Sequence, residues 1–219
     1  MDIGRSVGYV FEDRDWGRKV LIGGVVNLIP IVSLAAIGYT VRTMRNVATS
    51  AERPLPDWDD FGGDFIKGLL VAVAGLIYSL PAILVNVVLS VIGAMAQSGR
   101  SDEAAGVVGL CVAGLSCLVA LYAFVVALWT PAATMNYAAT GEFSAFFQFG
   151  RIWELISHNL GGYILALLVS AAAAFVAALA GIVLCVIGVA FTSFIAMLVY
   201  AYLLGQLLGE SGRLAAGQA

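Results

Sequence analysis

The sequence is poor in charge, and two long stretches have no charge at all. No Asp, Glu, Lys or Arg occurs between Glu103 and Glu142, and none occurs between Glu154 and Glu210. Only 11 % of all residues are charged, whereas soluble domains carry about 25 %. Both stretches exceed the length of about 20 apolar residues that a helix needs to cross a bilayer. The scarcity of charge therefore argues against a soluble domain and predicts an all-α integral membrane protein.

Histidine, cysteine and catalytic motifs are also scarce. Cys111 and Cys117 are six residues apart, so they fall on different faces of a helix, and we interpret the 3 cysteines as apolar packing residues. The sequence has no Ser–His–Asp set on loops, no metal-ligand spacing and no glycine-rich phosphate loop. We therefore expect no enzymatic activity, no cofactor and no metal. A net charge of −3 gives no reason to expect a nucleic-acid partner.

Four apolar stretches predict transmembrane helices packed in a compact bundle within one membrane domain, residues 1–219. The predicted spans cover residues 68–97, 104–137, 160–183 and 186–208. Polar residues predict a turn at Gln97–Glu103, and the last two spans are expected to turn near Cys185–Gly188. Pro81 lies inside the first span, and a polar tail follows at 209–219.

The first 15 residues predict an amphipathic helix on the membrane surface. Ile3, Val7, Val10 and Phe11 recur at helical spacing. A second helix is expected to begin at Trp16, near the lipid–water boundary, with Asp13 or Asp15 as its cap.

The apolar segment 18–41 has two possible interpretations, because Pro30 lies near its middle. Proline removes a hydrogen-bond donor and disfavours a helical residue before it. The segment is therefore either a kinked span or two half-helices in a re-entrant hairpin. If the segment crosses the membrane once, five of the 11 Lys and Arg residues lie on one side of the membrane and six on the other. If the segment returns to the side on which it started, ten lie on that side and only Arg100 lies on the opposite side. We predict the re-entrant form, with four full spans after it, in the cell (inner or plasma) membrane with both termini cytoplasmic.

The following cytoplasmic loop and interfacial helix, residues 42–67, contain the densest polar cluster. Hard cations prefer several carboxylate oxygens, so Asp57, Asp59 and Asp60 are candidates for a cation site. The same carboxylates suit the N-terminus of a helix, where the macrodipole favours negative charge. We favour this second interpretation, with neutralisation by Arg42, Arg45, Arg53 and Lys67. Trp58 and Phe61 belong to an aromatic face expected at the membrane interface.

Residues 142–158 form a second interfacial aromatic segment, which includes Trp153. His158, at the mouth of the next span, has two interpretations. A lone interfacial histidine suits a haem or pigment ligand, or it is a polar residue at a helix end. We favour the second.

Several segments carry a resemblance to a known family. They are Met1–Gly4, Tyr9–Asp13, Asp15–Trp16, Leu21–Gly24, Leu28–Val32, Gly38–Tyr39, Arg45–Asn46, Glu52–Gly62, Leu198–Ala201 and Leu204–Leu207. In these segments the chain resembles the domain-of-unknown-function family 4013. The resemblance implies a small prokaryotic polytopic membrane protein without an assigned activity, and it supplies no catalytic residues.

Composition and resemblance lead to the same functional expectation. Pumps and coupled transporters usually carry carboxylates or histidines at membrane depth, and the predicted spans carry none. We expect a non-catalytic structural or accessory role through helix–helix and lipid contacts. The expected partners are the lipid bilayer and either other membrane proteins or further copies of the chain. The alternative is a passive channel or small-solute facilitator that acts as a homo-oligomer.

Overall fold

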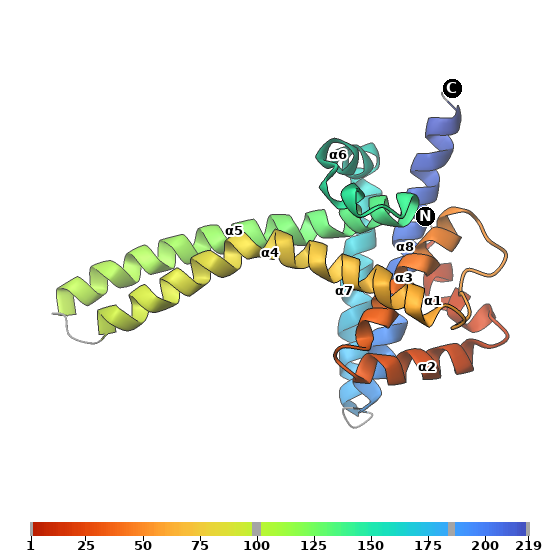
Figure 1. Ribbon diagram of the computed structural model, residues 1–219, viewed down its shortest axis with the longest axis horizontal. Coiled ribbons are helices and arrows are strands. Elements are labelled where there is room, and N and C mark those ends of the chain that lie inside the picture. Colours follow the sequence, from red (N-terminus) through yellow and green to blue (C-terminus); the bar gives the residue numbers. More distant parts are fainter. Residues whose placement is uncertain (1, 98–101, 184–186, 218–219) are drawn as a thin grey trace. The chain divides into compact units, whose positions relative to one another are not determined.

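The computed structural model describes residues 2–97, 102–183 and 187–217, and all regular elements in these ranges are helical (Figure 1). They are α1 (Ile3–Glu12), α2 (Trp16–Leu28), α3 (Ser33–Ala48), α4 (Phe61–Gln97), α5 (Asp102–Thr140), the 3-10 helix η1 (Phe143–Phe147), α6 (Phe149–His158), α7 (Leu160–Val183) and α8 (Ile187–Gly217). The predicted all-helical class is confirmed for these ranges. The chain divides into two compact units, residues 1–72 with 132–219, and residues 73–131.

Four helices are long and apolar enough to cross a membrane, as predicted. Their apolar parts are Phe61–Met95, Val108–Thr140, Leu160–Val183 and Gly188–Gly212. The predicted turns at Gln97–Glu103 and Cys185–Gly188 fall largely on residues 98–101 and 184–186, which lie outside the described residues.

The apolar stretch around Pro30 forms two helices rather than one. α2 ends at Leu28, α3 begins at Ser33, and the Ser33 hydroxyl donates a hydrogen bond to the Pro30 carbonyl at 2.5 Å. Proline disfavours helical geometry at the residue before it, which explains the break. At 1.5 Å per residue, the 13 residues of α2 and the 16 of α3 extend about 20 and 24 Å. Each is shorter than the hydrocarbon core, which is about 30 Å thick.

α8 is the central helix of the first unit and contacts α1, α2, α3 and α7. Two glycines let α2 lie directly against α8. A Cβ atom on Gly23 would overlap the ring of Phe194, and one on Gly24 would overlap the ring of Phe191. Phe194 is fully buried in the core cluster as a result.

α1 is held on α8 by polar and aromatic contacts. The Tyr9 hydroxyl donates to the Leu198 carbonyl at 2.9 Å, and the Tyr9 ring stacks on Tyr202 at 4.3 Å between centroids. Val10 is buried, whereas Val7 and Phe11 are half exposed. The apolar residues of α1 therefore point in two directions, some onto α8 and some outward.

α3 crosses the first turns of α4 with the two backbones in contact. A Cβ atom on Gly38 would overlap the Asp64 carbonyl oxygen, and one on Gly68 would overlap the Leu34 carbonyl oxygen. Small residues allow such close approach of helices. This crossing brings the polar end of α3 beside the N-terminus of α4.

The second unit consists of the C-terminal part of α4 and the N-terminal part of α5, which run side by side (Figure 1). The Tyr122 hydroxyl donates to the Tyr78 carbonyl at 2.8 Å, and Trp129 Nε1 donates to the Tyr78 hydroxyl at 3.3 Å. α4 continues through Pro81 without ending. Most large apolar side chains of this unit are exposed; Leu110, for example, is 79 % exposed.

Candidate functional site

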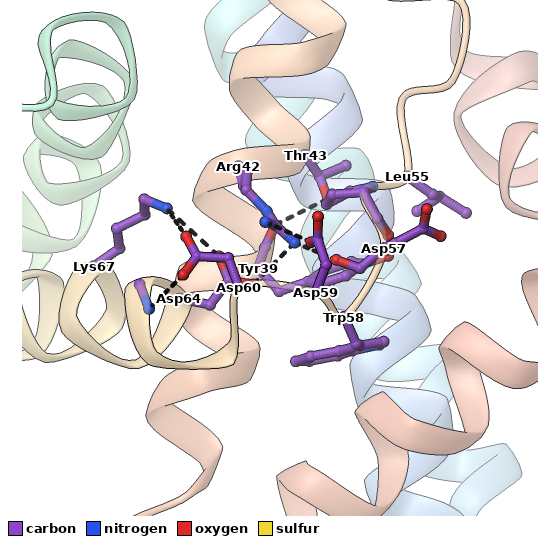
Figure 2. Close-up of polar contacts among 12 residues, drawn as sticks. Tyr39, Arg42, Thr43, Leu55, Asp57, Trp58, Asp59, Asp60, Asp64 and Lys67 are labelled. Atoms are coloured by element: carbon purple, nitrogen blue, oxygen red, sulfur yellow. Dashed lines mark hydrogen bonds and ion pairs between the residues drawn. The ribbon is translucent and has the colours of Figure 1, made fainter.

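A dense polar cluster of the first unit lies where α3, the loop 49–60 and the start of α4 meet (Figure 2). Lys19 of α2 joins it through an ion pair with Asp57. The loop is fixed by its apolar and aromatic residues. Leu55 is buried, and the Tyr39 hydroxyl donates to the Pro56 carbonyl at 2.7 Å. The Trp58 ring stacks on Tyr39 with centroids 4.4 Å apart, and its indole Nε1 donates to the Lys19 carbonyl at 3.1 Å. The loop is therefore held against α2 and α3.

Arg42 connects the loop to α4. Its Nη1 donates to Asp59 Oδ1 at 3.1 Å, and its Nη2 donates to the Asp57 carbonyl and lies 3.2 Å from Asp64 Oδ2. Backbone N–H groups of the loop and the Arg42 guanidinium hold the pKa of the exposed Asp59 carboxyl below its usual range. One side chain of α3 thus binds both sides of the turn that enters α4.

Asp64 is a fully buried carboxylate in the first turn of α4. Arg42 lies 3.2 Å from it and Lys67 Nζ lies 3.7 Å from it, yet neither carboxylate oxygen has a hydrogen-bond partner among the described residues. Its charge is therefore compensated by two cations without ideal hydrogen-bond geometry. Removal of either cation would leave this buried carboxylate poorly compensated, which is strongly destabilising.

Lys19 is a buried ammonium at the other end of the cluster. Its Nζ lies 2.8 Å from Asp13 Oδ2 and 3.1 Å from Asp57 Oδ1, and it donates to the Leu55 carbonyl at 3.0 Å. Burial raises the pKa of Asp13, but hydrogen bonds from Lys19 and the Asp15 backbone, with the charges of Lys19 and Arg53, outweigh it. The net effect is a pKa below the usual range. Lys19 thereby fastens both the α1–α2 turn and the loop 49–60.

Five of the residues predicted as interfacial or structural candidates, the consecutive residues Asp57 to Phe61, lie at this cluster. Only Asp60 caps α4: its Oδ1 accepts from the Gly63 N–H at 3.0 Å, and its Oδ2 lies 3.5 Å from Lys67. Asp57 and Asp59 lie in the loop, where they pair with Lys19 and Arg42. Of the predicted aromatic residues, Trp58 stacks on Tyr39 and lies 6.3 Å, between ring centroids, from Phe61, which is 41 % exposed.

The other candidates lie elsewhere. Trp16 packs edge-on against Phe11 at the start of α2, and Pro30 lies in the α2–α3 break. Pro81 belongs to the second unit. Trp153 and His158 are exposed on α6 and belong to no part of the cluster.

Three members of the cluster were not predicted as site residues: Asp13, Lys19 and Asp64. Asp64 was missed because the predicted span begins at residue 68, whereas α4 begins at Phe61 and already contains it. Its position in the first turn of an apolar helix was a usable signal. Lys19 has no comparable signal, since its partners become apparent only when the chain is folded. Of the four cations expected to neutralise the aspartates, Arg42 and Lys67 do so, while Arg45 and Arg53 form no ion pair with any residue that the structure describes.

The arrangement is suited to fastening chain segments rather than to holding a metal. No three His, Cys, Asp or Glu side chains within the described ranges converge as metal ligands. The cluster's carboxylates already face basic side chains. A divalent cation there would have to displace Arg42 or Lys67.

The comparison with known families agrees with the resemblance in the sequence. The family described as "Protein of unknown function (DUF4013)" matches residues 21–186. The chain belongs to the DUF4013 family. The matched region includes the break at Pro30, the cluster around Arg42 and the first three of the four candidate spans.

A curated relative is the uncharacterized protein MJ1189 of Methanocaldococcus jannaschii. It is 28 % identical over 141 residues, which are 64 % of this chain and 46 % of that protein. The chain therefore spans about half the length of the curated relative that it matches. No solved structure matches the chain at a significant level.

Proposed function

We propose that this DUF4013 protein is a non-catalytic integral membrane protein of the cell membrane, with a structural or accessory role through helix–helix and lipid contacts. The observation that carries the proposal is the exposure of apolar surface on helices long enough to cross a bilayer. Leu84 is 63 % exposed, Leu110 79 % and Phe124 61 %. In water such a surface would cost about 25 cal/mol per Å². Lipid or another transmembrane helix removes that cost.

The charge distribution supports a re-entrant α2–α3 hairpin in the proposed topology. Neither helix is long enough to cross alone, and the break at Pro30 allows the chain to return. Both termini and ten of the 11 basic residues then lie on the cytoplasmic side. The half-exposed Val7 and Phe11 of α1 are suited to contact with the membrane surface.

The polar cluster has a mechanical role in this proposal. Arg42 and Lys19 tie the re-entrant hairpin to the start of α4, so that the hairpin keeps its position as the longer helices contact lipid or a partner. Carboxylates of the cluster compensate both cations, and the proposal assigns no catalytic role to any of these groups.

Extraction in mild detergent followed by mass spectrometry tests the proposal. We expect a second membrane protein to co-purify at constant stoichiometry. A variant with Leu121→Ala and Phe124→Ala, both exposed on α5, should lose this partner if the second unit is the contact surface. The matched control is Phe175→Ala with Leu179→Ala, which truncates similarly exposed side chains on α7.

Two outcomes would contradict the accessory role. A chain that purifies alone and monodisperse has no stable partner. A homo-oligomer that releases a small solute from liposomes is a passive channel instead.

A further inference from the structure

A cavity of about 420 Å³ lies between α3, α5, α6 and α8, all within the first unit. Two of its lining residues are arginines, Arg45 of α3 and Arg151 of α6, and none of the lining residues described is acidic. We call it the Arg45–Arg151 pocket. Two basic side chains that have no carboxylate beside them create a positive electrostatic potential, which attracts anions.

Arg45 and Arg151 differ from the basic residues of the polar cluster. Arg42, Lys19 and Lys67 each have at least two carboxylate partners, whereas neither Arg45 nor Arg151 forms an ion pair in the described part of the chain. Glu154, three positions after Arg151, and Glu210, between the lining residues Gly209 and Ser211, do not line the pocket. Glu210 instead accepts a hydrogen bond from Asn159 at 3.5 Å. The two guanidinium groups are therefore available to an external anion.

A second cavity, of about 530 Å³, lies on another side of Arg45. Arg42, Arg45 and Lys67 line it, again without an acidic residue among its described lining. Arg45 is common to the two cavities. Arg42 and Lys67 are compensated by Asp59, Asp60 and Asp64, so Arg45 is the cation without a carboxylate partner that both cavities share.

The pocket is built on a fixed support. Asn136 of α5 is buried and lines it, and its Nδ2 donates to the Ala145 carbonyl at 2.9 Å and to Gln148 Oε1 at 3.2 Å. These bonds fasten η1 and the residue that precedes α6. Arg151 follows in the first turn of α6, so its position is set by the same contacts.

The remaining lining contains apolar as well as polar residues, and α6 carries two exposed aromatic residues. Leu155 and Leu208 line the pocket beside the arginines. Phe149 and Trp153, one turn apart on α6, are 57 % and 62 % exposed. An occupant that matches both parts carries a negative charge at one end and apolar chains at the other.

We propose that the Arg45–Arg151 pocket binds the phosphate of an anionic phospholipid headgroup, with the acyl chains along α6. The guanidinium fork matches phosphate oxygens in pairs. Basic pockets between helices on the cytoplasmic side recognise anionic headgroups in this way. The inference rests on the proposed membrane location, and it assigns the lipid class that the protein selects there.

The test measures lipid binding by the purified full chain in detergent, by native mass spectrometry and by thermal unfolding. Phosphatidylglycerol should be retained and should raise the unfolding midpoint, while phosphatidylcholine should do so much less. The double variant Arg45→Gln, Arg151→Gln should bind phosphatidylglycerol at least about tenfold more weakly. The matched control, Arg14→Gln with Arg18→Gln, removes two exposed and unpaired arginines elsewhere and should bind like the unmodified chain.

Three results would overturn the proposal. One is equal affinity of the double variant and the unmodified chain for phosphatidylglycerol. Another is equal retention of both lipids by the unmodified chain, a measurement that needs no variant to fold. The third is stabilisation by inorganic phosphate alone equal to that by the lipid, which would assign the pocket to free phosphate. Headgroup selectivity is measured without a partner protein, so its failure is distinct from failure of the accessory role.

Discussion

Asp64 is the residue at which burial and charge conflict most. Its carboxylate is fully buried, is compensated by Arg42 and Lys67, and has no hydrogen bond to either oxygen among the described residues. Removing one partner of a buried ion pair usually costs about 3–5 kcal/mol, because the remaining charge is left uncompensated. Arg42 is the nearer of the two cations, at 3.2 Å against 3.7 Å for Lys67, so its loss would leave the buried carboxylate poorly compensated.

We therefore expect Arg42→Gln, which leaves the buried Asp64 carboxylate with Lys67 alone, to lower the free energy of unfolding by about 3 kcal/mol. The matched control is Asp59→Asn, which removes the exposed partner of the same arginine and should cost about 1 kcal/mol or less. Unfolding of both variants in detergent micelles checks the difference. Equal costs would show that burial of Asp64 is unimportant.

Asp13 makes stability depend on pH. Its folded-state pKa lies below the usual 3.8, so its pairing with Lys19 stabilises the fold fully above about pH 5 and is lost as the pH falls through about 4 and below. The unmodified chain should therefore unfold at a higher temperature than Asp13→Asn at neutral pH, and this difference should vanish in acid. A difference that stays constant from neutral pH to about pH 2.5 would contradict the role of this carboxylate.

Parts of the candidate site could be predicted from the sequence, for physical reasons that are local. A short carboxylate side chain before an apolar helix is a cap, which is how Asp60 acts. Arg42 was expected among the neutralising cations because it lies close to the aspartates in the chain. Lys19 with Asp57, and Asp64 with Arg42, depend on contacts between separate helices, which no local pattern encodes.

At the level of elements, the α3–α4 crossing depends on two glycines. A side chain on Gly38 or Gly68 would collide with backbone atoms of the facing helix, and backbone atoms cannot turn aside as side chains do. Forced overpacking costs about 1–3 kcal/mol.

Gly38→Ala should therefore destabilise the protein by about 2 kcal/mol, although alanine favours a helix by about 1 kcal/mol over glycine. Gly17→Ala in α2 is the control, because a Cβ atom there meets nothing within 4 Å. It should leave the unfolding midpoint unchanged or raise it. If both variants behave alike, the close crossing does not exist in solution.

The two prolines singled out in the sequence show where element prediction succeeds and fails. The chain breaks at Pro30 but continues as a helix through Pro81. Proline removes one hydrogen bond in both places, and surrounding contacts decide whether the helix ends. Four long apolar helices were predictable from composition; the division of the chain into two units was not, because it depends on packing between distant segments.

At the scale of the whole molecule, the proposed topology makes a direct prediction. With a re-entrant α2–α3 hairpin, the loop that contains Ala51 faces the cytoplasm, on the same side as both termini. The variant Ala51→Cys is made in a chain whose three native cysteines, Cys111, Cys117 and Cys185, have been replaced. The new cysteine should react with a membrane-impermeant maleimide only in inside-out vesicles. A cysteine at Ser98 is the control and should react only from the outside. Labelling of the cysteine at position 51 from the outside would show that the segment 18–41 crosses the membrane.

The contacts that hold α1 against α8 have a consequence for the synthesis of the chain. Tyr9 donates to Leu198, 189 positions later, and the Asp2 backbone N–H donates to Gln206 at 2.9 Å, 204 positions later. Contacts this distant in sequence form late, because the intervening chain must first be in place. During synthesis α1 therefore leaves the ribosome well before α8, and Tyr9 and Val10 stay uncovered until α8 arrives. A nascent chain stopped before α8 keeps α1 undocked and open to quality-control proteases.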